Sequence, residues 1–167
     1  MEMSLAKIFG SLAVALVVAN AMPAVAQQTA PPPPADSGVI RAKSAYDMDE
    51  TVARLKKDIQ AKGLRFFDEI DQSALAQSAG IKLHPSVLLM FGNPPLGIQF
   101  ITSNPYAGLD WPVRMLVFRD DAGQVWIAYT DFSFIAHRHH IADLPAQFKM
   151  ASDVAASVAA SAAGAPH

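Results

Sequence analysis

Four consecutive prolines, Pro31 to Pro34, separate the first part of the chain from the rest. Proline has a fixed φ and no backbone N–H, so this stretch cannot enter a helix interior or a central strand. It favours an extended polyproline spacer. We therefore expect a linker over residues 27–38 and a globular domain that begins only after it.

The residues before this linker have the three-part pattern of a secretory signal peptide. A short head with Lys7 precedes the apolar run Ile8 to Met22, and Ala24-Val25-Ala26 supplies the small residues that a signal peptidase requires. The apolar run is shorter than the roughly 20 residues of a membrane span. We predict that residues 1–26 are removed after Ala26, which would leave a periplasmic or secreted protein without a membrane anchor.

The charge balance and the lack of cysteine exclude several classes of function. Lys and Arg together number 13 against 15 Asp and Glu, a net charge of −2, so no excess of positive charge points to a nucleic-acid partner. The chain has no cysteine, which excludes disulfides, thiol catalysis and cysteine-ligated metals. Stability must therefore come from a hydrophobic core.

The clearest helix signal follows Asp47. Asp47 and Glu50 have the spacing of a capping box, and Gly63 is typical of a helix end. The apolar side chains between them recur at helical spacing and share one face: Met48, Val52, Leu55 and Ile59. This pattern predicts an amphipathic helix.

Strands are expected in the remaining apolar runs, at 39–44, 64–70, 86–91, 98–102, 113–119 and 124–130. Gly92 to Gly97 is rich in turn residues and is expected to form a loop, and 120–123 a hairpin turn. Asp71 caps a short helix, and another helix follows Asp131. Residues 39–145 are thus predicted to be α+β, with a mostly antiparallel sheet of about five to six strands in the order β-α-β-α-β-β-β-β-α, covered on one face by helices. Residues 146–167 are expected to form an Ala-rich C-terminal helix that frays into a tail.

Several motifs in this region resemble those of a known family. They are Phe91-Gly92-Asn93-Pro94 with Gly97, Leu109-Asp110-Trp111-Pro112-Val113-Arg114, Val125-Trp126-Ile127-Ala128-Tyr129, and Arg138-His139. Their order and spacing are similar to those of the bacterial and archaeal family of unknown function numbered 302, over about residues 40–142. The resemblance implies a fold like that of the TATA-binding protein, often a dimer, with no established activity. Two residues depart from the family pattern: Gln72 stands where many members have histidine, and Trp111 where leucine is usual.

Arg114 is the charged residue that most needs a partner. It alternates with Leu116 and Phe118, and therefore points to an apolar face of the sheet. A fully buried guanidinium without a partner would cost roughly 3–5 kcal/mol. The acids that could pair with it are Asp110, Asp68, Glu69 and Asp71. Such a pair would either anchor an anionic ligand or only close the edge of the sheet.

The histidines between residues 137 and 140 form the densest cluster of titratable side chains. On a helix, His137 and His140 share a face, and with His139 and His84 they would suit copper or zinc. The alternative is a solvated helix end, where cationic groups favour the dipole. We predict no cofactor, with a copper or zinc site at these four histidines as the alternative.

The leading hypothesis is a non-catalytic binding module for an unknown small molecule or protein partner. Its candidate ligand-binding residues are Asn93, Asp110, Arg114, Tyr129 and His139, although Asn93 would equally serve to brace its turn. One alternative is a periplasmic protein that binds copper or zinc through the histidine cluster. Another is a hydrolase or isomerase with His139 as base and Asp110 as its orienter, which requires the two side chains to approach within about 3 Å.

Overall fold

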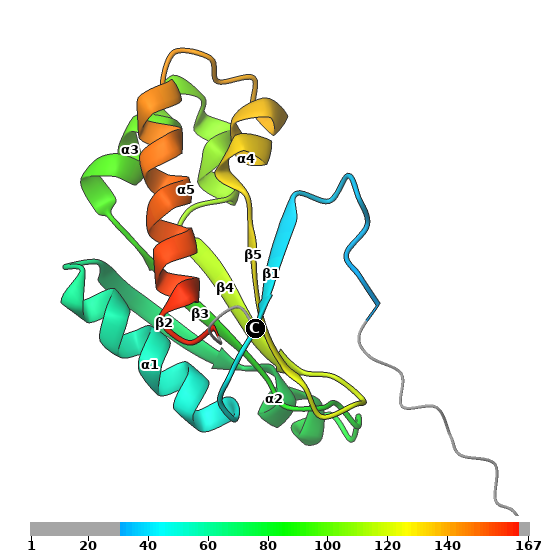
Figure 1. The fold of residues 1–167 in the computed structure, drawn as a ribbon. Helices are drawn as coiled ribbons and strands as arrows, with labels where there is room; N and C mark the ends of the chain where they lie inside the picture. Colours follow the sequence, from blue (N-terminus) through cyan, green and yellow to red (C-terminus); the bar gives the residue numbers. More distant parts are fainter. Residues whose placement is uncertain (1–30, 164–167) are drawn as a thin grey trace, which may run out of the picture.

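The computed structural model describes residues 31–163, so the predicted signal peptide and the first residues of the predicted linker lie outside the described residues. This part of the chain contains both strands and helices (Figure 1). In chain order the elements are β1 (Val39–Lys43), α1 (Met48–Ala61), β2 (Arg65–Asp71), α2 (Gln72–Ser78), β3 (Ser86–Gly92), α3 (Pro94–Ser103), the 3₁₀ helix η1 (Pro105–Leu109), β4 (Val113–Arg119), β5 (Val125–Thr130), α4 (Phe132–Arg138) and α5 (Pro145–Ala160).

The five strands form one sheet in the order β1-β5-β4-β3-β2, and every neighbouring pair is antiparallel. The first strand therefore closes one edge beside the last strand, and β2 forms the other edge. A bulge between Phe66 and Asp68 interrupts the pairing of β2 with β3. The predicted α+β class with an antiparallel sheet against helices is confirmed.

The hydrophobic core lies between one face of the sheet and the helices beside it (Figure 1). Alternate residues of the central strands face this layer and are fully buried, as the two-residue period of a strand requires. The helix α1 contributes Leu55 and Ile59, in agreement with its predicted apolar face. The strand residues are Leu89, Phe91, Met115, Val117 and Ile127.

The predicted loop at Gly92 to Gly97 and the predicted strand at 98–102 are both wrong. Gly92 ends β3, and the residues from Pro94 onward belong to α3, which Asn93 caps by accepting a hydrogen bond from the Leu96 N–H at 3.3 Å. Pro94 and Pro95 occupy the first helical positions, where a missing N–H costs nothing. Residues of these types favour either a turn or the start of a helix. Here the cap that Asn93 provides favours the helix. The sheet therefore has five strands.

The Ala-rich C-terminal stretch is a helix that packs in the core. Phe148 and Val158 of α5 are buried, and so are Ala151 and Ala155 between them. Beyond the helix, Ala162 is fully buried and Ala163 pairs with Ser44. The expectation that this stretch frays is wrong as far as Ala163, because alanine side chains let the helix lie close to its neighbours. Within residues 31–163 no helix is long and apolar enough to cross a membrane.

Candidate functional site

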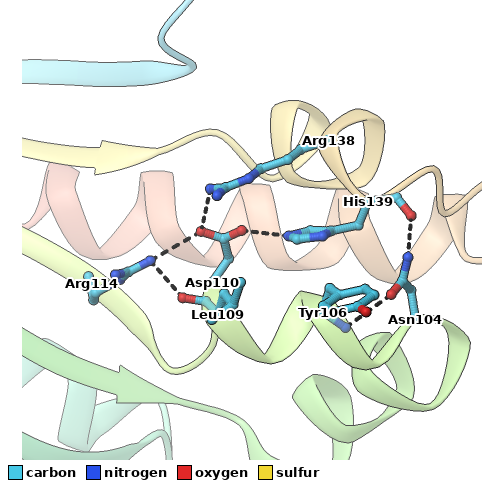
Figure 2. A network of polar contacts seen from close by, with 7 residues as sticks. All are labelled: Asn104, Tyr106, Leu109, Asp110, Arg114, Arg138 and His139. Carbon is cyan, nitrogen blue, oxygen red and sulfur yellow. Dashed lines mark hydrogen bonds and ion pairs between the residues drawn. The ribbon is translucent and has the colours of Figure 1, made fainter.

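Asp110 is the centre of a polar network at the end of η1 (Figure 2). Its side chain is only 5% exposed, and it has charged or ionisable partners on three sides. One carboxylate oxygen, Oδ2, lies 2.6 Å from Nε2 of His139. The other, Oδ1, accepts hydrogen bonds from Nη2 of Arg114 at 3.1 Å and from Nη1 of Arg138 at 3.2 Å.

Three separate elements bring these side chains together. Asp110 follows η1, Arg114 lies in β4, and Arg138 with His139 ends α4. The Asn104 amide joins two of these elements, because its Nδ2 donates to the His139 carbonyl at 2.8 Å while its Oδ1 accepts from the Tyr106 N–H. These bonds place the end of α4 beside the 3₁₀ helix.

The two guanidiniums are held in place but still reach solvent. Arg114 is 49% and Arg138 is 50% exposed, whereas the His139 side chain is 6% exposed. Nη2 of Arg114 also donates to the Leu109 carbonyl at 2.9 Å. Each guanidinium uses one nitrogen in these contacts and has further N–H groups without a partner among residues 31–163. Two fixed arginines against one carboxylate leave excess positive charge, which suits an anion.

The comparison with protein families supports the resemblance seen in the sequence. The model of the family "Domain of unknown function DUF302" matches residues 40–162. The chain belongs to this family. A crystal structure of an uncharacterized conserved DUF302 protein from Bacillus stearothermophilus has the same fold, with a TM-score of 0.63 and 19% identity over 75% of this chain and 96% of that chain.

Curated relatives of this DUF302 chain are named as ion channels and not as members of a family of unknown function. "Fluoride-specific ion channel FluC 1" of Brucella suis is 34% identical over 106 residues, which are 64% of this chain and 42% of that protein. "Fluoride-specific ion channel FluC 2" of Brucella melitensis is 34% identical over 106 residues, 39% of its length. The chain thus spans about 40% of the length of these relatives and shares with them one region rather than a whole protein.

Two of the residues predicted for the ligand site do not join the Asp110 network. Asn93 caps α3 and so serves as the brace that the sequence analysis offered as its alternative role. Tyr129 pairs across the sheet with Met115 and belongs to the core, on the face opposite to the neighbouring Arg114. Burial first, and the negative charge of Asp131 second, raise the pKa of Tyr129. Tyr129 is therefore a core residue in this DUF302 domain.

Of the four acids proposed as partners of Arg114, the structure uses Asp110. Glu69 instead pairs with Lys56 of α1 at 2.7 Å. Asp71 caps α2, and the hydrogen bonds from the Ser73 hydroxyl and the Ala74 N–H lower the pKa of its carboxyl group. Asp68 accepts a bond from the next residue in its own strand. The partner of Arg114 is therefore Asp110, the acid that lies nearest to it in the sequence.

The histidines do not assemble into a metal site. His84 precedes β3 and lies 2.9 Å from Asp121 in the β4–β5 hairpin, whereas His137, His139 and His140 follow β5 at the opposite end of the sheet. The ring of His139 is bound to Asp110, and His137 and His140 have ring centroids 6.3 Å apart. In the described part of the chain, no three His, Asp or Glu side chains could jointly hold a metal ion.

Sequence reasoning missed two members of the network, Arg138 and Asn104, as site residues. Arg138 is next to His139 and is the last residue of α4, so its adjacency to a predicted site residue was the available signal. Asn104 precedes a proline, which is the pattern of a helix cap, and it does cap η1. Its second hydrogen bond to the His139 carbonyl crosses 35 residues of chain and has no local signature.

Proposed function

We propose that this DUF302 domain is a non-catalytic binding module that holds an oxyanion between Arg114 and Arg138. The observation that carries the proposal is that two half-exposed guanidiniums donate to one oxygen of a buried carboxylate. The ligand class is a carboxylate or phosphate group, whose paired oxygens match the planar donors of arginine.

The buried carboxylate gives this site its rigidity. Free arginine side chains lose considerable rotamer entropy when they bind a ligand. Here Asp110 already orients both guanidiniums, and the Leu109 carbonyl orients Arg114 further. Part of the ordering cost is thus met before the anion arrives, and half of each arginine side chain stays accessible to it.

Titration of the purified domain with phosphate, acetate and fluoride tests this proposal. Fluoride belongs in the series because the curated relatives are named fluoride-specific ion channels. We expect an oxyanion to bind, and Arg114→Gln or Arg138→Gln to raise its Kd about tenfold or more, since a hydrogen bond to a charged group contributes about 1.5–3 kcal/mol. Calorimetry at low ionic strength measures this, because salt screens exposed charges.

Arg119→Gln is the matched control, because it removes the same charge from an exposed arginine of β4 outside the network. It should change the Kd by less than about threefold, as expected of screened charge alone. If all three variants weaken binding equally, the site between Arg114 and Arg138 is rejected. Binding of fluoride in place of every oxyanion would reject the proposed ligand class but keep the site.

The short contact between Asp110 and His139 favours a second candidate, a hydrolase or isomerase. The 2.6 Å separation meets the distance that an orienting carboxylate and a catalytic base require. The low exposure of His139 argues against it, because a substrate atom would have to reach a buried ring. Ester or enolisable ketone turnover that His139→Gln abolishes, in a variant that still folds, would place this candidate first.

We also propose that the protein acts outside the cytoplasmic membrane as a homodimer. The sequence pattern before Gln27 and the family resemblance support these two proposals. Native mass spectrometry of periplasmic extract should give twice the mass of a chain that begins at Gln27. Ala26→Lys should leave the precursor uncleaved, since the peptidase needs a small residue there. A native chain that retains residues 1–26 would contradict export by cleavage, and a monomer mass would contradict the dimer.

A further inference from the structure

The chain reverses its direction between the four prolines and β1, as the blue segment of Figure 1 shows. The carbonyl of Pro34 accepts the N–H of Ser37 at 3.0 Å and its hydroxyl at 2.7 Å, which closes a turn. Gly38 follows with a φ of +66°, and a Cβ atom there would lie 2.2 Å from Cγ of Phe134 in α4. Only glycine lets the turn lie against α4 in this way. The proline segment, Pro31–Pro34, is thereby brought beside β1.

The first proline of this segment lines a mostly apolar groove on the face of the sheet that points away from the core. Its apolar lining residues come from three parts of the chain: Pro31, Leu83, Pro85, Leu116 and Phe118. Leu116 and Phe118 alternate along β4 with the buried core residues and are themselves half-buried. The groove has a volume of about 370 Å³, within the range of roughly 300–1,000 Å³ that is usual for ligand pockets. It can therefore take more than the one proline ring that lines it.

Arg41 of β1 supplies a polar contact to the same segment. Its Nη1 donates to the carbonyl of Pro31 at 3.1 Å. The guanidinium lies over the ring of Trp126, 4.2 Å from the centroid, and the Trp126 indole N–H is bonded to Oδ2 of Asp120 at 2.8 Å. The donor thus rests on a buried ring that is itself held in place. A polyproline helix has no internal hydrogen bonds, so its carbonyl groups are available to a donor of this kind.

We propose that this groove recognises polyproline segments and that the chain's own segment, Pro31–Pro34, is its occupant. Domains that bind such segments use aromatic-lined grooves and gain from the preformed, extended conformation of the ligand. Here Phe118 supplies the aromatic ring and Arg41 the donor. The turn at Ser37 keeps the segment close, which raises its effective concentration to roughly the millimolar range, so that a weak contact suffices. The groove is separate from the proposed oxyanion site and does not depend on it, since it uses neither arginine of that site.

Nuclear Overhauser contacts in the native chain test whether the segment occupies the groove. We expect contacts between protons of Pro31 and the side-chain protons of Arg41, because Nη1 of Arg41 lies 3.1 Å from the Pro31 carbonyl oxygen. The contacts should persist on dilution, as contacts within one molecule do. A mixture of isotope-labelled and unlabelled copies should give no such contact between copies.

A full chain with Pro31→Gly, Pro32→Ser, Pro33→Gly and Pro34→Ser opens the groove to a ligand added from outside. The probe is a synthetic peptide of residues 31–37, Pro-Pro-Pro-Pro-Ala-Asp-Ser. We expect it to shift the Phe118 ring signals and the Trp126 indole signal in a saturable manner, with a Kd in the millimolar range. The native chain should bind the peptide at least about threefold more weakly, because its own segment competes for the groove. A control peptide with glycine at the four proline positions should not bind.

Arg41→Gln in the opened chain separates the hydrogen bond to the peptide from the apolar contacts. It removes the charged donor, so the Kd for the peptide should rise about three- to tenfold. Lys43→Gln is the matched control, because Lys43 carries the same charge on the same strand and lies over the same Trp126 ring at 5.5 Å. It should change the Kd by less than about twofold, as expected of screened charge alone. Thermal unfolding verifies that each variant folds, and the spectrum of the native chain needs no variant.

Three results would overturn the proposal. The first is a folded, opened chain that does not bind the proline peptide, or that binds the glycine peptide equally well. The second is a native chain that binds the proline peptide as tightly as the opened chain, which would show that its own segment does not occupy the groove. The third is a contact between Pro31 and Arg41 that forms only between copies, which would assign the groove to the segment of a second copy.

Discussion

Replacing Asp110 with alanine is expected to lower the free energy of unfolding by about 3 kcal/mol. The substitution removes a buried acceptor, leaves the His139 ring nitrogen without its partner and places two guanidiniums near each other without a counter-charge. Breaking a buried ion pair from one side costs about 3–5 kcal/mol, and we take the lower end because solvent screens the half-exposed arginines. Urea unfolding followed by tryptophan fluorescence measures the change.

Asp121→Ala is the control for this experiment. Asp121 is also an aspartate with a histidine partner, His84, but its side chain is 60% exposed. Its loss should change the free energy of unfolding by no more than about 0.5 kcal/mol, as for other surface substitutions. Equal effects of the two variants would mean that the Asp110 network does not hold the arginines in place, and the basis of the proposed oxyanion site would be lost.

Replacing Phe148 with alanine is expected to destabilise the domain by about 3–5 kcal/mol. The Phe148 ring is buried, and it stacks on Phe100 of α3 with 4.2 Å between the ring centroids. This contact joins the last helix of the described chain to the helix that the sequence did not predict. Truncation to alanine leaves a cavity at the centre of that junction, and chemical unfolding reports its cost.

Lys149→Ala tests whether the effect comes from burial rather than from helix propensity. Lys149 is the next residue in α5, and its side chain is 74% exposed. Alanine there should change stability by less than about 0.5 kcal/mol, since the exposed pair with Asp153 contributes little. A mild effect of Phe148→Ala, similar to that of Lys149→Ala, would show that α5 is attached only loosely to the core.

The elements that were predicted correctly have signals within a few residues of one another. Asp47 with Glu50 marks the start of α1, and its Oδ1 accepts the Glu50 N–H at 2.9 Å as a cap should. The β4–β5 hairpin is similar, since Asp120 accepts bonds from the Ala122 and Gln124 N–H groups within the turn. Such contacts form between neighbours in the chain, so residue type and spacing suffice to find them.

The wrong predictions for residues 92–102 and for the C-terminal stretch have in common that distant parts of the chain decide the structure there. The residues from Asn93 to Pro95 suit a loop as well as a helix start, and the indole of Trp111 against Gly97 accompanies the helical choice. The alanines of α5 give a weak amphipathic pattern. Their burial depends on the close approach of α4 and α1, which the segment itself does not encode.

For the candidate site, the sequence by itself determined the family and the fold class and named Asp110 as a possible partner of Arg114. The expectation that Arg114 points to a buried apolar face is wrong, because its side chain is 49% exposed and the buried residues of β4 are Met115 and Val117 on the other face. The sequence also named Asp110 and His139 as a pair to examine, but only the tertiary structure placed Nε2 of His139 against Asp110 and added Arg138 and Asn104. The physical reason is the range of the interactions. Periodicity, caps and turns act over one or two turns of chain, whereas the Asp110 network forms only when η1, β4 and the end of α4 have been packed together.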